Sequence, residues 1–290
     1  MTPKKPPTIS QDLPPLNPGD YDYFSPFAER PPFVPRPLTV VNWPNAWWLA
    51  EFSLLAYCTE ANVRLGMAQS GFRLRPKFFI DKDAQVLVAE SDDAIVVAFR
   101  GTEAPNFTRT GLFRFFQTVV DSGQDWLINA KAKLVPLVVD GVSRGKVHSG
   151  FLSAFNSIKV DLRAAIAELQ SAKPRPVWYT GHSLGGALAT LAAAQAGDAT
   201  GLYTFGCPRV GDDQFVAVFS TLSQSARVCL SGDPVPEVPL ETALFPYAHV
   251  GTSVSPVAPP LFQFSNPRRH APMLYSVSVW NRLILESAES

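Results

Sequence analysis

Short apolar runs alternate along this chain with longer runs whose apolar residues recur at helical spacing. The short runs are apolar throughout, which predicts buried strands at 86–90, 94–102, 133–139, 177–181, 202–208 and 227–232. The longer runs predict helices at 46–58, 124–132, 151–170, 186–197 and 213–221. Strands that are buried on both faces and alternate with helices predict an α/β fold, with a mostly parallel sheet covered on both sides.

The first 44 residues differ in composition from the rest of the chain. Eleven of the 27 prolines lie within the first 37 residues. Because proline restricts φ and lacks a backbone N–H, residues 1–44 are predicted to form an extended arm. Part of this arm is expected to lie across the domain, since it carries the aromatic residues Tyr21, Tyr23, Phe24, Phe27 and Phe33. Residues 45–290 show no repeat and are predicted to form one domain.

Net charge and cysteine content indicate which binding partners and which cellular compartment are expected. Lysine and arginine total 25 and acidic residues also total 25, so the net charge is zero and nucleic-acid binding is not expected. No apolar stretch has the length of a membrane span, and the first residues do not form a leader peptide. Buried free thiols are favoured for Cys58, Cys207 and Cys229, although a Cys207–Cys229 bridge stays open. These features suit the cytoplasm, or secretion if a leader has been removed.

The sequence Gly181-His182-Ser183-Leu184-Gly185 stands between a predicted strand and a predicted helix. This is the setting of a nucleophile elbow, in which serine occupies a strained corner and only small neighbours let the strand and helix pack around it. A purely structural turn is the alternative. The small residues on both sides of Ser183 favour the elbow, with Ser183 as the nucleophile.

An elbow serine needs a base and an acid, which in this fold follow in the chain order serine, acid, histidine. Asp233 is the preferred acid because it follows a buried strand, and open α/β sheets build their sites at strand carboxyl ends. The competing acids are Asp198, Asp212, Asp213 and Glu237, of which Asp212 and Asp213 are better explained as helix caps.

Two histidines follow Ser183 in the chain, and their local sequences differ. His270 lies in a polar loop that leads into a final helix or strand, whereas His249 lies in a strand-like setting typical of a packing residue. The sequence therefore favours His270 as the base and leaves His249 as the alternative.

Several stretches together resemble the class 3 lipase family, a fungal-lipase-like branch of the α/β-hydrolases. In chain order they are VVAFRGT (96–102), DWL (125–127), VHSGF (147–151), GHSLGGALA (181–189), YTFGCPRVGD (203–212), DPVPEVP (233–239) and YAHVG (247–251). The resemblance implies an α/β-hydrolase fold with Ser183 as nucleophile, Asp233 as acid and His270 as base. It also implies a structural role for His249.

The same resemblance implies an oxyanion hole and a lid. The hole would be formed by the backbone N–H of Leu184 and by Thr102, and the lid by an insertion at 105–123. The insertion carries one apolar stripe at helical spacing, formed by Leu112, Phe115, Phe116, Val119 and Val120. A mobile lid over the acyl pocket and a helix packed permanently on the core fit this stripe equally well.

These residues predict a serine hydrolase that cleaves carboxylic esters of acyl lipids, as a triacylglycerol lipase or esterase does. The chemistry needs no metal or organic cofactor. Phospholipase A1 and a short-chain or feruloyl-type esterase are the enzymatic alternatives. A non-catalytic lipid-binding relative and a serine peptidase are less favoured, because no triad member is missing and the motifs after Ser183 do not suit a peptidase.

Overall fold

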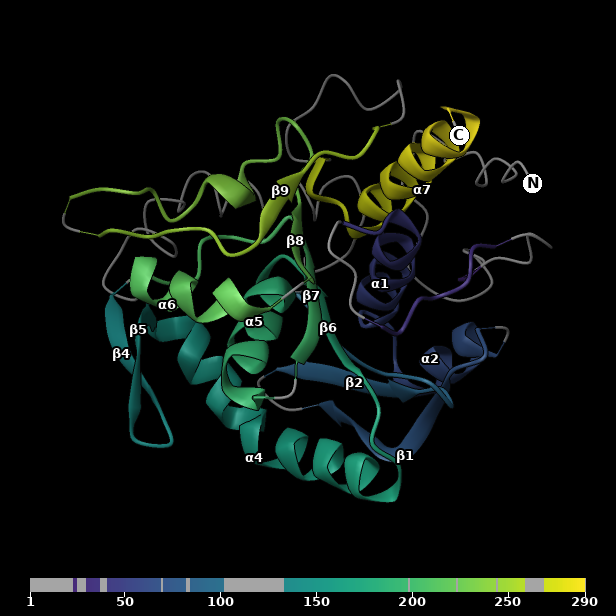
Figure 1. Cartoon of the computed structure of the whole chain (residues 1–290), viewed down its shortest axis with the longest axis horizontal. Helices are drawn as coiled ribbons and strands as arrows, with labels where there is room; N and C mark the ends of the chain where they lie inside the picture. The colour runs from purple at the N-terminus through teal and green to yellow at the C-terminus, as the bar shows by residue number, and fades with distance from the viewer. Residues whose placement is uncertain are drawn as a thin grey trace.

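A central β-sheet carries helices on both of its faces in the computed structural model (Figure 1). The structure describes residues 23–24, 30–36, 41–68, 70–81, 84–101, 133–197, 199–222, 224–243, 245–258 and 269–289. Thr102, the 105–123 insertion with its five stripe residues, and the predicted helix at 124–132 lie outside the described residues.

Seven strands form the central sheet within the described ranges, in the order β1-β2-β3-β6-β7-β8-β9. Their bounds are β1 Arg73–Asp81, β2 Gln85–Glu90, β3 Ile95–Phe99, β6 Val177–His182, β7 Ala199–Phe205, β8 Gln224–Val228 and β9 Thr252–Val254. β1, β2 and β3 pair antiparallel, and every pair from β3 to β9 is parallel. The predicted, mostly parallel sheet is thereby confirmed. A separate antiparallel hairpin consists of β4 Leu134–Val139 and β5 Val142–His148.

The helices divide into two layers with a core on each side of the sheet (Figure 1). Their bounds are α1 Trp43–Leu55, α2 Glu60–Met67, α4 Ser149–Ala172, α5 Leu184–Ala196, α6 Asp213–Ala217 and α7 Pro272–Glu289, with 3-10 turns η1 Val218–Thr221 and η2 Val235–Glu237. α1 and α7 pack together on one face, where the Trp47 and Trp280 ring centroids are 4.7 Å apart. α4 and α5 cover the other face.

The described elements that were not predicted are α2, β1, β5, β9 and the short η2 turn. In β5 (VSRGKVH), charged side chains interrupt the apolar residues, so the strand lacks the continuous apolar run used to recognise the others. α1 begins three residues earlier than predicted because the Asn42 side chain accepts a hydrogen bond from the Asn45 N–H at 2.8 Å and Pro44 suits the first turn. α5 ends at Ala196 and is capped by Gly197, which has a left-handed φ of 73° that glycine adopts without strain.

Residues 30–36 of the arm are bonded to the domain through side chains of α1 and β6. Asn45 binds the Val34 backbone twice, because its amide nitrogen donates to the carbonyl and its oxygen accepts from the N–H, both at 2.8 Å. The Trp48 indole donates to the Pro31 carbonyl at 2.8 Å, and the Trp178 indole to the Pro35 carbonyl at 3.0 Å. These bonds satisfy backbone groups that proline-rich chain cannot pair in a ladder.

The aromatic residues of the arm that the structure describes belong to the core under α1. Tyr23 and Phe24 are buried, and the Phe24 ring contacts Trp48 and Phe52 with centroids 5.1 and 4.8 Å apart. The Phe24 N–H donates to the buried Glu51 carboxylate at 2.7 Å. Residues 23–24 therefore fill the same apolar layer as the helices.

His148 ends β5 and caps α4. Its Nδ1 accepts hydrogen bonds from the backbone N–H groups of Gly150 and Phe151, at 3.1 and 3.3 Å, so the ring must be neutral with its proton on Nε2. Burial lowers the pKa of His148 from its usual 6.5 to about 4.

This neutral cap predicts a loss of stability in mild acid. Between pH 6.5 and about 4 the unfolded chain protonates His148 and the folded chain does not, so the free energy of unfolding falls as pH drops through this window. His148→Asn keeps an accepting cap and removes the titration. In urea unfolding at about pH 7 and about pH 5, the variant should lose less stability than the parent. Equal losses would contradict the assignment.

Candidate active site

Ser183 stands at the corner between β6 and α5 in a strained backbone conformation. Its φ is 59° and its ψ is −128°, a region that residues with a side chain rarely adopt. The Ser183 N–H donates to the Phe205 carbonyl on β7 at 2.9 Å, which binds the corner to the next strand. The serine is buried, with 7% of its surface exposed.

Three glycines around Ser183 allow strands and helix to approach one another. A Cβ on Gly181 would lie 2.2 Å from the Gly185 carbonyl oxygen, and a Cβ on Gly185 would lie 2.2 Å from the Phe99 carbonyl oxygen of β3. A Cβ on Gly186 would lie 2.9 Å from the Cβ of Cys207. Any side chain at these positions would push α5 away from the sheet and so move the corner that holds Ser183.

The start of α5 and the end of β3 meet at Ser183. Leu184 is the first residue of α5, so its N–H is one of the four at a helix start that have no intrahelical carbonyl partner. A Cβ on Gly101 would lie 3.2 Å from the Ser183 Cβ, so the chain passes beside the serine one residue before Thr102. Leu184 is thus placed next to Ser183, while Thr102 itself lies outside the described residues.

Asp233 and His270 are bonded to each other in the interior of the protein. His270 Nδ1 and Asp233 Oδ2 are 2.8 Å apart, and both side chains are buried. The other carboxylate oxygen of Asp233 accepts the Val235 N–H at 2.9 Å, which fixes the carboxylate plane. Gly206 lines this pair, because a Cβ there would lie 2.9 Å from Asp233 Oδ2 and 3.1 Å from the His270 ring.

Tyr275 is a functional candidate that the sequence motifs do not indicate. Its hydroxyl donates to the same Asp233 Oδ2 at 2.5 Å and accepts the Leu230 N–H at 3.3 Å. Burial and the Asp233 charge raise the pKa of Tyr275 well above its usual value, so the hydroxyl keeps its proton. Its closeness to His270 in the chain was the one available signal, and a tyrosine five residues away is common by chance.

His182 connects the elbow to His270. The two ring centroids are 4.4 Å apart, and the Tyr57 hydroxyl lies 2.8 Å from His182 Nδ1. Burial, with a smaller contribution from His270, lowers the pKa of His182 well below its usual value. A neutral ring next to Ser183 therefore packs on His270 and places it beside the elbow.

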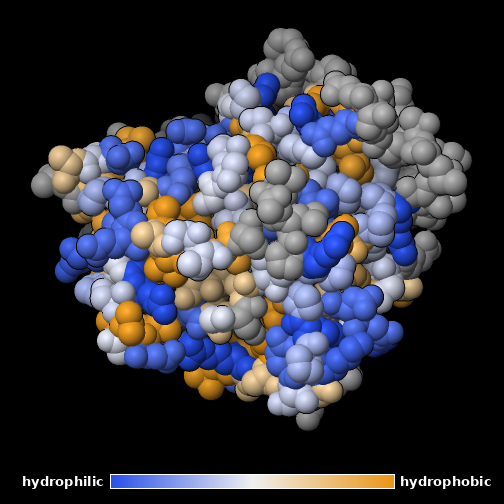
Figure 2. All heavy atoms as spheres, in the orientation of Figure 1, coloured by the Kyte–Doolittle hydropathy of each residue, from blue (hydrophilic) through white to orange (hydrophobic). Residues whose placement is uncertain are grey.

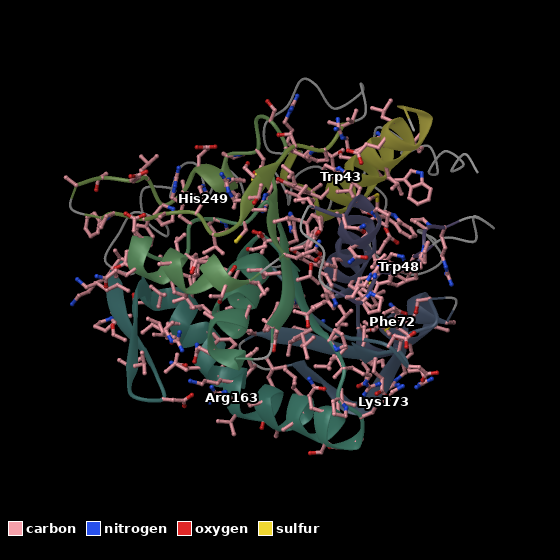
Figure 3. All side chains as sticks on the ribbon, viewed as in Figure 1. Trp43, Trp48, Phe72, Arg163, Lys173 and His249 are labelled. Carbon is pink, nitrogen blue, oxygen red and sulfur yellow. The ribbon has the colours of Figure 1, made fainter. Side chains whose placement is uncertain are left out.

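His249, the alternative base, lies three residues before β9 (Figure 3), and the Asp233 carboxylate is bonded to His270. Burial lowers its pKa to about 3, and the charges of Arg227 and Arg209 act in the same direction. Its interaction with the Pro236 backbone joins it to the η2 turn that follows Asp233. The structure thus pairs Asp233 with His270 and gives His249 a supporting position.

Two of the acidic residues that compete with Asp233 for the triad position make other interactions. Asp212 caps α6 by accepting the Phe215 N–H at 2.9 Å, and it also accepts the Lys146 N–H at 3.0 Å. Glu237 is 72% exposed and lies 3.8 Å from Arg209. Asp213 lies in the first turn of α6, as expected of a residue that opens a helix, and Asp198 is outside the described residues.

Within the described part of the chain, no group of three or more His, Cys, Asp or Glu side chains could hold a metal ion. None of the helices described there has the length and apolarity needed to cross a bilayer. Cys58, Cys207 and Cys229 are free thiols, and of the three Cys58 and Cys207 are buried as predicted while Cys229 is half-buried.

Residues 96–243, half of the chain, match the family model described as lipase (class 3). The chain belongs to the class 3 lipase family. This confirms the resemblance carried by the motifs around Ser183. The described residues contain both the elbow and the Asp233–His270 pair.

Curated relatives match parts of this chain. A secreted mono- and diacylglycerol lipase of Fusarium solani is 44% identical over 109 residues, which cover 36% of this chain and 32% of the relative. A lipase of Rhizomucor miehei is 32% identical over 181 residues, covering 59% and 44%. The chain thus spans one third to one half of the length of such relatives.

Solved structures extend the similarity across the fold. A triacylglycerol lipase whose catalytic centre is described as a serine protease triad aligns with a TM-score of 0.56 and 26% identity, over 76% of this chain and 82% of that one. A Rhizomucor miehei triacylglyceride lipase aligns with a TM-score of 0.54 and 25% identity, over 73% and 78%. Together they confirm the α/β-hydrolase fold.

The contact between α5 and β3 predicts that the chain will not tolerate a methyl group at Gly185. In Gly185→Ala the new Cβ meets backbone atoms of Phe99, which cannot move without shifting the strand. We expect a loss of about 2–4 kcal/mol in the free energy of unfolding, measured in urea.

Gly66→Ala is the matched control. There the nearest atom is the flexible end of the Leu55 side chain, and alanine favours the helix α2. The control should change stability by less than about 1 kcal/mol. Equal effects of the two substitutions would show that the α5–β3 contact does not limit residue size.

Proposed function

We propose that this protein is a serine hydrolase that cleaves carboxylic esters of acyl lipids. The observation that carries the proposal is the His270–Asp233 pair, buried and bonded at 2.8 Å, next to an elbow that holds Ser183 at a φ of 59°. A nucleophile, a base and a group that orients the base are the components that acyl transfer requires. Family membership and the fold support the same assignment.

In the proposed mechanism, His270 takes the proton of Ser183 as the serine oxygen attacks the ester carbonyl. Asp233 holds the proton of Nδ1, which leaves the other ring nitrogen as the proton acceptor, and it stabilises the imidazolium that forms. The backbone N–H of Leu184 and the residue Thr102 donate to the oxyanion. His270 then protonates the leaving alcohol, and water repeats the sequence on the acyl-enzyme to release the fatty acid.

Acylglycerols are the proposed substrates. The curated relative from Fusarium solani is named a mono- and diacylglycerol lipase, and the aligned structures are of triacylglycerol lipases. The relatives from Fusarium solani and Penicillium cyclopium are both named secreted lipases, which supports the alternative that this protein is secreted.

Ser183→Ala tests the nucleophile. The variant lacks the attacking oxygen, so hydrolysis of nitrophenyl esters should fall by more than about a thousandfold, while the thermal unfolding midpoint stays unchanged. Ser157→Ala, which removes a serine hydroxyl bonded to the Ala154 carbonyl on α4, is the control and should keep full activity. Turnover that survives in Ser183→Ala would overturn the proposal.

A hydrolysis panel separates the substrate classes. Nitrophenyl esters of increasing chain length are compared with emulsified triacylglycerol and with phosphatidylcholine. A lipase should accept long chains and hydrolyse the triacylglycerol emulsion. A steep fall with chain length would indicate a short-chain esterase instead, and preference for phosphatidylcholine a phospholipase A1.

Tyr275→Phe removes the hydrogen bond from the Tyr275 hydroxyl to Asp233 Oδ2, the oxygen that also binds His270. Without this bond the carboxylate that orients His270 is held less firmly, so kcat/KM should fall about tenfold or more. Without the tyrosine proton the carboxylate holds the protonated imidazole more strongly, so the acid limb of the pH–rate profile should move to higher pH.

Tyr203→Phe is the control for this variant. It also removes a buried hydroxyl, which accepts the Asn42 N–H at 2.9 Å and has no contact with Asp233. It should lose stability and keep the parental pH profile. A Tyr275→Phe profile that coincides with the parental one would reduce Tyr275 to a purely structural residue.

A further inference from the structure

Tyr57 lies in the turn that follows α1, and its hydroxyl reaches the residue before Ser183. The hydroxyl oxygen is 2.8 Å from Nδ1 of His182, and the centroids of the two rings are 5.9 Å apart. Both residues are buried. Figure 2 shows hydrophilic and hydrophobic residues intermixed over the visible surface, where water competes for polar groups. The Tyr57–His182 bond lies in the interior and is protected from that competition.

The Tyr57 hydroxyl is the donor in this bond. A phenolic O–H is a better donor than the N–H of a neutral imidazole, and an unprotonated imidazole nitrogen is a better acceptor than a phenolic oxygen. Burial lowers the pKa of His182 well below its usual value, so its ring is neutral and has one nitrogen without a proton. Nδ1 is that nitrogen, and the proton of the ring stands on Nε2.

The backbone on both sides of Tyr57 is held by the buried side chain of Gln85. The Gln85 amide nitrogen donates to the Ala56 carbonyl at 2.8 Å and to the Cys58 carbonyl at 2.9 Å. The Gln85 side-chain oxygen accepts a hydrogen bond from the Arg100 guanidinium at 2.6 Å, and the Gln85 carbonyl accepts the Arg100 N–H at 2.9 Å. Because Arg100 directly follows β3, the turn that carries Tyr57 is bonded to the carboxyl end of this strand.

The Tyr57 hydroxyl fills a narrow space between the end of β3 and the elbow. A Cβ on Gly101 would lie 2.1 Å from this hydroxyl oxygen and 2.7 Å from the His182 carbonyl oxygen. A larger residue at position 101 would therefore displace either the tyrosine or the elbow backbone. Glycine at this position lets the hydroxyl reach the His182 ring from the β3 side.

The His182 ring contacts both of the side chains that bind Asp233 Oδ2. Its centroid is 4.4 Å from that of His270, and 5.4 Å from that of Tyr275. His270 and Tyr275 are each bonded to the same carboxylate oxygen. A rotation of the His182 ring would therefore move its contacts with both partners of Asp233. The bond from Tyr57 opposes that rotation, because the ring is then fixed at one of its nitrogens.

We propose that Tyr57 is a positioning residue for His270 and acts through the His182 ring. The proposal rests on the proposed function, which makes His270 the base. A base must stand close to its productive position, since a displacement of about 1 Å costs about a hundredfold in rate. The bonds of Gln85 hold the Tyr57 turn, Tyr57 holds the His182 ring, and that ring packs on His270. The alternative is a structural role, in which Tyr57 only satisfies a buried imidazole nitrogen.

Tyr57→Phe keeps the ring and removes the proton that His182 accepts. With nitrophenyl butyrate, kcat should fall about tenfold and KM should change by less than about twofold, because His270 acts in both halves of the reaction while substrate binding is retained. Tyr203→Phe is the control, since it removes a buried hydroxyl that accepts the Asn42 N–H, and it should keep the parental kcat. An unchanged kcat in Tyr57→Phe, a rise in KM alone, or an equal fall in both variants would overturn the inference.

A double-mutant cycle tests whether Tyr57 acts through His182. His182→Phe keeps a flat ring against His270 but offers no acceptor to the Tyr57 hydroxyl. When Tyr57→Phe is added to His182→Phe, kcat should fall by less than about twofold further, because the bond has already been lost. A further loss of about tenfold would show that Tyr57 acts on the reaction by another route, and the inference would be wrong.

A proton resonance tests the same arrangement without turnover and in single variants that keep their rings. The proton between His270 Nδ1 and Asp233 lies in a charge-assisted hydrogen bond and should resonate far downfield. It should shift or broaden in Tyr57→Phe and match the parent in Tyr203→Phe. A resonance that is unchanged in Tyr57→Phe, or absent from the parent, contradicts the inference. If the resonance responds as expected and the protein hydrolyses no ester, the proposed function alone is wrong.

Discussion

The backbone of Ser183 is the constraint on which the rest of the site depends. A φ of 59° is unfavourable for serine and persists because its surroundings leave no relaxed alternative. The Ser183 N–H is bonded to β7, and α5 lies so close to β3 that the Gly185 position has no space for a Cβ. The glycines therefore determine the backbone conformation of Ser183, because they let α5 pack closely against the sheet on either side of the serine.

The other half of the site is positioned from the opposite face of the sheet. His270 lies just before α7, and Tyr275 lies in its first turn. Two contacts hold α7 against α1, namely the packing of Trp47 on Trp280 and a hydrogen bond from Ser276 to the buried Glu51. Glu51 also accepts the Phe24 N–H, so arm, α1 and α7 share one buried carboxylate. Packing in this layer thus determines where the base meets the elbow, although these residues are all far from Ser183 in the sequence.

What could be predicted from the sequence is what local physics encodes. The elbow, the sheet class and the cap at Gly197 follow from small residues and apolar runs, and Asp233 follows from its place after a strand. Tyr275 could not be predicted, because its role depends on the fold, which brings its hydroxyl oxygen to 2.5 Å from Asp233 Oδ2. β5 could not be predicted because its charged residues interrupt the apolar pattern. It is a strand because it pairs with β4. The roles of Thr102 and of the 105–123 insertion remain predictions.

The four histidines show how the fold selects one base. Burial lowers the pKa of His148, His182 and His249, so these rings stay neutral and act as a cap, a packing surface and a support for the Asp233 loop. Among the described residues, only His270 is bonded to a carboxylate, which compensates the charge that a base acquires when it accepts a proton. Burial without a carboxylate makes a histidine structural, and burial with one makes it suitable for proton transfer. Asp233 therefore distinguishes His270 from three rings of the same chemical type.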